Sequence, residues 1–69
     1  MRYFDYEEAA QSAGVSSVNL EQIKAVVRLE FPSDDMMFEL HVLRACTAFG
    51  EGWATIDQIL AAEPMEARS

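Results

Sequence analysis

Residues 9–23 read AAQSAGVSSVNLEQI, and this stretch decides the fold. Small and apolar residues recur at intervals of three and four on both sides of Gly14, which is the spacing of two amphipathic helices. Glycine readily adopts the left-handed backbone conformation that ends many helices. The stretch therefore predicts two short helices joined by a tight turn at Gly14. The positions at which these helices would touch are Ala10, Val15, Leu20 and Ile23.

Helix start and stop signals bound these first two helices. Asp5 can accept hydrogen bonds from the free amides of a first turn, so the first helix is expected to begin after it and to run to about Ala13. The second helix is expected to start near Ser17 or Asn19. Pro32 disfavours helical backbone at the residue before it, so the second helix ends there.

The same signals predict two further helices. Ser33 opens the third, which stops at Gly50. Thr55 caps the fourth, with Gln58 at the spacing of a capping box, and Pro64 ends it. Both are short, and no stretch between them has the alternating pattern of a strand.

These elements predict an all-α fold, a compact bundle of about four short helices with a helix-turn-helix-like corner at its N-terminal end. A single helical domain is expected over residues 1–63, followed by a flexible tail over residues 64–69. Since every connection is short, helices adjacent in the sequence are expected to pack on each other. A chain of 69 residues buries only about 60% of its unfolded surface, so we expect a homodimer to supply further stability.

The third helix is apolar on two opposite sides, and this leaves its place in the fold open. Such a helix lies either in the middle of a bundle or with one side against a partner. One side of the helix consists of Met36, Leu40, Leu43 and Thr47. The opposite side consists of Phe38, Val42, Ala45 and Phe49.

Tryptophan and methionine are enriched at protein interfaces, and both occur in or near the third helix. Trp53 follows that helix in a loop, where it would either plug the core between the third and fourth helices or anchor a partner. The candidate residues for a protein interface are Met36, Met37, Leu40, Leu43 and Trp53.

Charge restricts the classes of partner. The chain has 12 acidic and 5 basic side chains, a net charge of −7. Residues 15–32 are neutral overall, and no segment is basic. Because binding to nucleic acid and to anionic membranes depends on positive charge, the composition argues against both. It favours a protein partner with a basic surface.

Compartment and chemistry follow from what the sequence lacks. The acidic N-terminal residues show no apolar signal segment, and no apolar run reaches the roughly 20 residues of a membrane span. We therefore expect a soluble, cytoplasmic protein. His41 and Cys46 are the strongest metal-ligand types, but their spacing places them on different sides of a helix. Cys46 has no histidine at contact spacing. We expect no metal, no cofactor and no enzymatic activity.

Residues 10–23 resemble the helix-turn-helix of transcription regulators, and the stretch from Phe38 to Leu60 resembles the later helices of MerR-type regulators. The resemblance implies a DNA-binding regulator whose second helix enters the major groove. The chain departs from that family because residues 30–35 (EFPSDD) replace its basic wing. The residues that would face DNA are Ser16, Ser17, Gln22, Lys24 and Arg28.

Three interpretations of the helix-turn-helix-like corner thus stay open: DNA binding, protein binding and packing alone. Taken with the acidic charge, the sequence favours a small non-catalytic regulatory or adaptor module that binds another protein. A helix-turn-helix transcription regulator is the alternative.

Overall fold

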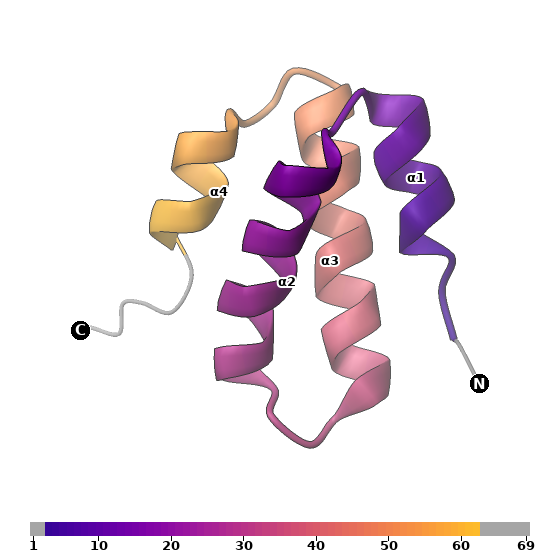
Figure 1. The fold of residues 1–69 in the computed structure, drawn as a ribbon, viewed down its shortest axis with the longest axis vertical. Helices are drawn as coiled ribbons and strands as arrows, with labels where there is room; N and C mark the ends of the chain where they lie inside the picture. Colours follow the sequence, from indigo (N-terminus) through magenta and orange to yellow (C-terminus); the bar gives the residue numbers. More distant parts are fainter. Residues whose placement is uncertain (1–2, 63–69) are drawn as a thin grey trace.

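A computed structural model describes residues 3–62, and these residues form four helices and no strand. The helices are α1 (Tyr6–Ala13), α2 (Ser17–Glu30), α3 (Asp35–Gly50) and α4 (Ile56–Ala62). Figure 1 shows them gathered into a small bundle, which confirms the predicted all-α fold. Pro64 and the tail expected over residues 64–69 lie outside the described residues.

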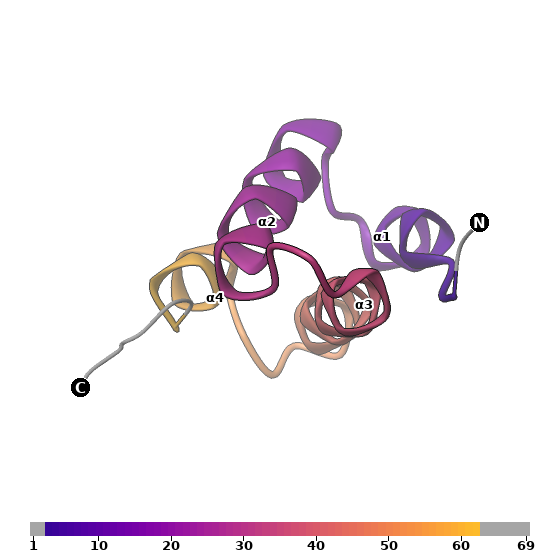
Figure 2. The same cartoon turned by 90° about the horizontal axis from the view of Figure 1, so that it is seen from below.

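Helix α3 is the centre of the packing. Helices α1 and α2 both pack on α3, whereas α4 packs on α2 (Figures 1 and 2). The expectation that neighbours in sequence pack on each other holds for α2 with α3, whereas α1 with α2 and α3 with α4 are not among the main contacts. The most extensive contact joins α1 to α3, which are separated in the sequence by the whole of α2.

Small residues explain this contact between α1 and α3. A Cβ atom at Gly50 would lie 2.7 Å from the Cβ of Ala13, so the two helices meet there at backbone distance. About one turn earlier in α1, Ala10 is almost completely buried, and Ala9 is partly buried against the core. Alanine and glycine allow helix backbones to approach closely, and a longer side chain at Gly50 would force them apart.

Both α1 and α3 end in the same backbone motif, in which a left-handed glycine follows the helix. After α1, the N–H of Gly14 (φ 83°) donates to Gln11, and the N–H of Val15 donates to the carbonyl of Ala10. After α3, the left-handed residue is Gly52 (φ 81°) and not Gly50, which remains within the helix. The two hydrogen bonds donated by Gly14 and Val15 satisfy carbonyl groups that the end of α1 would otherwise leave free.

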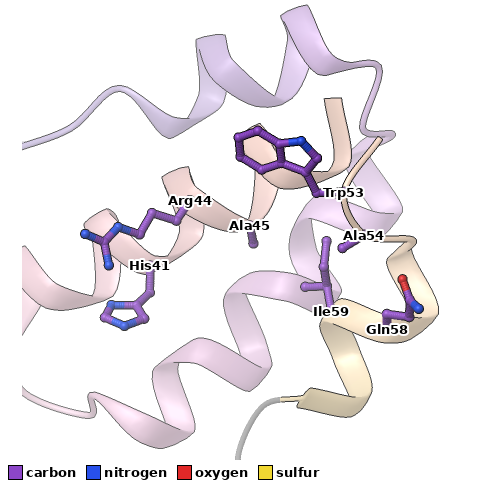
Figure 3. Close-up of a pocket in the computed structure, with 7 residues that line it drawn as sticks. All are labelled: His41, Arg44, Ala45, Trp53, Ala54, Gln58 and Ile59. Carbon is purple, nitrogen blue, oxygen red and sulfur yellow. The ribbon is translucent and has the colours of Figure 1, made fainter. Parts of the chain in front are cut away.

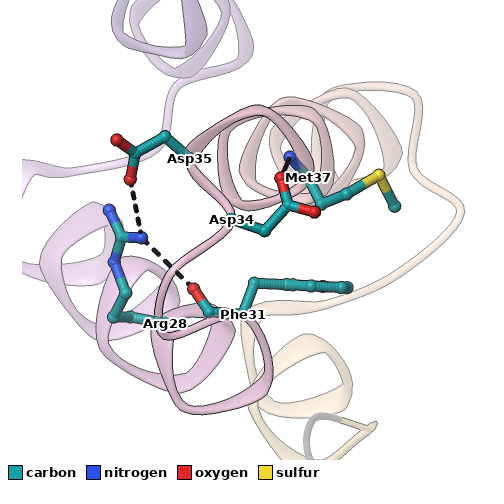
Figure 4. Close-up of polar contacts among 5 residues, drawn as sticks. All are labelled: Arg28, Phe31, Asp34, Asp35 and Met37. Carbon is teal, nitrogen blue, oxygen red and sulfur yellow. Dashed lines mark hydrogen bonds and ion pairs between the residues drawn. The ribbon is translucent and has the colours of Figure 1, made fainter.

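Each helix N-terminus is capped by a side chain that accepts a hydrogen bond from the backbone amide three residues later. The prediction for the fourth helix is confirmed, because Thr55 accepts from the Gln58 amide and the Gln58 side chain accepts from the Thr55 amide. The prediction that Ser33 opens the third helix is wrong: Asp34 accepts from the Met37 amide at 3.1 Å (Figure 4). The four capping residues are Asp5, Ser16, Asp34 and Thr55.

All four helices contribute residues to the core. Phe38 and Val42 are buried, whereas Met36 on the opposite side of α3 is exposed, so the structure decides which side of α3 is internal. Tyr6 meets Phe38 edge to face, with ring centroids 6.1 Å apart. The buried apolar residues are Tyr6, Ala10, Val15, Ile23, Val27, Phe38, Val42, Cys46 and Ile59.

Arg28 fixes the turn between α2 and α3. Its guanidinium donates to the Phe31 carbonyl at 3.2 Å and to Asp35 at 3.0 Å (Figure 4). The same group lies over the Phe38 ring, 3.8 Å from its centroid. A cation over an aromatic face and a bond to a carbonyl near the end of α2 are both favourable. Arg28 therefore links the two helices and shields one edge of the core.

Glu39 is the one charged residue that is buried within residues 3–62. Its Oε1 atom accepts hydrogen bonds from the backbone N–H groups of Tyr3 at 2.6 Å and Phe4 at 2.9 Å. These bonds hold the segment before α1 against α3. Hydrogen bonds to an ionised acceptor are stronger than neutral ones, which offsets the cost of burying the carboxylate.

Gly50→Ala is expected to lower the free energy of unfolding by about 1–3 kcal/mol, because the new methyl group would overlap Ala13. Urea denaturation would measure the change. The double variant Ala13→Gly/Gly50→Ala should recover part of the loss relative to Gly50→Ala alone. Additive effects of the two substitutions would contradict a direct contact.

Glu39→Ala is expected to destabilise the fold by about 1–3 kcal/mol, because two amides lose a charged acceptor. Glu39→Gln keeps an acceptor oxygen and should lose less. Amide hydrogen exchange at Tyr3 and Phe4 should speed up in the alanine variant. Unchanged exchange at both amides would show that Glu39 does not hold this segment.

Candidate protein-binding site

A groove of about 450 Å³ lies between α3 and the loop and helix that follow it. Helices α3 and α4 do not pack tightly on each other, and this leaves room between them. In Figure 3, Ala45 lies in the middle of the groove. His41 and Arg44 of α3 are on one side of it, and the residues of the loop and of α4 are on the other. The lining residues are His41, Arg44, Ala45, Trp53, Ala54, Gln58 and Ile59.

The backbone of Trp53 is fixed although its side chain is free. Its N–H donates to the Ala48 carbonyl at 2.9 Å, which completes the motif that ends α3. Val15 has the same place in the motif that ends α1, and its side chain is only 8% exposed. The Trp53 side chain is 75% exposed. Two residues in equivalent backbone positions thus differ in burial. The backbone of Trp53 is held by a hydrogen bond, and its indole is exposed to solvent.

This exposure decides between the two interpretations of Trp53. A residue that plugs the core between α3 and α4 would be buried, and Trp53 is not. Burying a tryptophan removes a large apolar area from water, and in the isolated chain most of the Trp53 surface stays in contact with water. The core-plug interpretation is wrong, and the interface interpretation is compatible with the structure.

The groove also has positively charged or ionisable side chains, in contrast to the acidic chain as a whole. Arg44 is exposed, and within residues 3–62 the structure gives it no ion pair. His41 lies one turn before it, with its Nδ1 atom donating to the Met37 carbonyl at 3.0 Å and its ring 4.6 Å from that of Phe31. Sequence reasoning missed Arg44, although its spacing of three from His41 places both on one side of α3.

The other predicted interface residues do not gather around Trp53. Met36 is exposed, but it lies in the first turn of α3, at the opposite end of the helix from Trp53. Met37 and Leu40 are partly buried, and Leu43 packs against the core. The structure therefore separates the candidates into an exposed methionine, a partly covered middle and the groove at Trp53.

The residues predicted to face DNA are engaged within the chain to different degrees. Ser16 caps α2, and Lys24 forms an ion pair with Glu21 at 3.1 Å while lying over the Tyr6 ring. Arg28 is held in the turn between α2 and α3. Ser17 and Gln22 are exposed on α2.

A second groove, of about 470 Å³, lies between α1 and α2 and is acidic at one end. Three carboxylates from the start of α1 stand at this end, and apolar and uncharged polar side chains line the rest. Such a surface is complementary to a cationic side chain with an apolar stem. Its lining residues are Asp5, Glu7, Glu8, Ala10, Gln11, Val15, Ser17 and Leu20.

Cys46 is completely buried, and this burial raises the pKa of its thiol, which disfavours the nucleophilic thiolate. Residues 3–62 contain no group of three or more histidine, cysteine or acidic side chains placed to hold a metal ion. None of their helices has the length and apolar character needed to cross a bilayer.

Comparison with known proteins gives no relative: no family model, curated protein or solved structure matches this chain.

Trp53→Ala is expected to change the free energy of unfolding by less than about 0.5 kcal/mol, because the side chain packs on little. Ile59→Ala, at a buried position of the same groove, should cost about 2–5 kcal/mol. Denaturant unfolding compares the two. Since Trp53 is the single tryptophan, its fluorescence should also resemble that of tryptophan in water and be quenched freely by acrylamide. A strongly protected emission would contradict the exposed indole.

Proposed function

We propose that the protein is a small non-catalytic regulatory or adaptor module that binds another protein through the groove at Trp53. The observation that carries this proposal is the exposed indole on a backbone held by the end of α3. Aromatic anchors in such settings often supply much of the affinity of an interface. Because the backbone of Trp53 is already held by this hydrogen bond, little further backbone entropy would be lost when a partner covers the indole.

The charge distribution supports a particular kind of partner. The net charge of −7 would attract a protein with a basic surface over a distance and raise the rate of encounter. At the groove between α1 and α2, Glu8 offers a carboxylate to a cationic side chain of that protein. At the Trp53 groove, Arg44 adds a hydrogen-bond donor beside the apolar contact. We therefore propose that the partner presents an apolar residue, with a hydrogen-bond acceptor for Arg44 beside it, within a surface that is basic overall.

The alternative, a helix-turn-helix DNA-binding regulator, finds less support. Its two cationic side chains, Lys24 and Arg28, both contact acidic or aromatic groups of the same chain. A DNA-binding surface needs such groups for phosphate contacts. The acidic groove also lies beside the start of α2, where it would repel a phosphate backbone.

Trp53→Ala should abolish the capture of a protein partner from an extract of the source cells while leaving the fold intact. Captured proteins would be identified by mass spectrometry and then titrated in purified form against the Trp53 fluorescence of the wild type. We expect the rate of association to fall as salt is raised, since the opposite charges would be screened.

Tyr3→Ala is the matched control, because it removes another exposed aromatic side chain outside the groove. Loss of capture in both variants to the same degree would contradict a specific role for Trp53. Binding of generic duplex DNA at low salt, lost steeply as salt rises, would instead support the helix-turn-helix alternative.

A further inference from the structure

The outer side of α2 carries an unpartnered apolar stripe. Val18 is 67% exposed and Leu29 is 71% exposed, and Gln22 and Ala25 between them are exposed as well. Figure 2 shows a side of α2 that no other helix of the described chain faces, and the exposure of these four residues agrees with a place on that side. The Trp53 groove contains no residue of α2, so the stripe is a separate surface.

The spacing of the stripe is that of a short coiled-coil seam. Its four positions follow one another at intervals of four, three and four residues, which is the alternation of a and d positions in a heptad repeat. We propose that this stripe joins two copies of the chain, with the two α2 helices antiparallel about a two-fold axis.

An antiparallel pair of these helices matches large with small residues. Val18 of one copy would face Leu29 of the other, and Gln22 would face Ala25, so each side chain meets a complementary volume. Because the two-fold axis repeats every contact, the four residues of one copy make a closed interface with the same four of the other. The small Ala25 lets the helices approach closely, and the polar Gln22 near the axis favours a single register.

Charge favours a second copy at this surface over other surfaces of the same chain. Residues 15–32 carry Lys24 and Arg28 against Glu21 and Glu30, so α2 lies in a neutral segment of an otherwise acidic chain. Two copies can meet along α2 without the repulsion that a charge of −7 produces elsewhere.

The outer side of α3 fits a second copy less well. Of its apolar residues, Leu43 already packs against the core and Leu40 is partly buried, which leaves only Met36 well exposed. The dimer expected from the size of the chain is therefore assigned to α2. Such a dimer would also cover Gln22, one of the residues predicted to face DNA.

Sedimentation equilibrium over a concentration series tests the proposal. The wild type should form dimers, and Leu29→Glu should raise the dissociation constant of the dimer on the order of 100-fold, because two leucines leave the interface. Met36→Glu is the matched control, since it places the same charge at an exposed apolar position on α3. Circular dichroism would show that both variants remain folded. A wild type that stays monomeric at millimolar concentration, or a dimer lost only in Met36→Glu, would overturn the proposal.

Disulfide cross-linking tests the direction of the helices. In the antiparallel dimer, a mixture of Val18→Cys and Leu29→Cys chains should form a mixed disulfide. Each variant alone should not, because its two cysteines would lie about 16 Å apart along the helices. The buried Cys46 leaves the wild type as a control without cross-linking. Cross-linking of each variant alone, without the mixed product, would indicate parallel helices and overturn the arrangement.

Discussion

The close approach of α1 and α3 at Ala13 and Gly50 is the constraint on which the rest of the fold depends. A Cβ atom at Gly50 would lie only 2.7 Å from the Cβ of Ala13, so the helices are too close at this point for any side chain on Gly50. With α1 placed there, Tyr6 can reach Phe38, and the segment before α1 can reach Glu39. Helix α2 must then lie on the remaining side of α3, and α4, with no place left beside α1, covers α2.

Local features of the fold could be predicted from the sequence because their causes are local. The capping pair Thr55 and Gln58, the left-handed Gly14 and the end of α2 before Pro32 each depend on residues within one or two turns. The order of packing could not be predicted in this way. It depends on contacts such as that of Glu39 with Tyr3, over 36 residues, for which the sequence has no periodic signal.

Val15 and Trp53 show that burial at the candidate site could not be predicted from a local motif either. Both residues follow a left-handed glycine and donate the same helix-ending hydrogen bond. The motif fixes the backbone and the direction in which the chain leaves the helix, but burial depends on what lies beyond it. After α1 the chain turns into the core, whereas after α3 it crosses toward α4, which packs on α2 and leaves the groove open. The groove is thus a consequence of the packing order and not of any motif at Trp53.

The acidic charge and the three surfaces form one consistent arrangement. A small chain with a charge of −7 repels its own copies, so self-association has to use a neutral surface, and the neutral segment is the one that contains α2. The same charge attracts a basic partner, and the carboxylates of Asp5, Glu7 and Glu8 are concentrated at the start of α1, away from the outer side of α2. A dimer through α2 would leave both the acidic groove opening and the Trp53 groove of each copy outside the seam. Two identical binding surfaces on one dimer would raise its affinity for a partner that repeats its basic, apolar epitope.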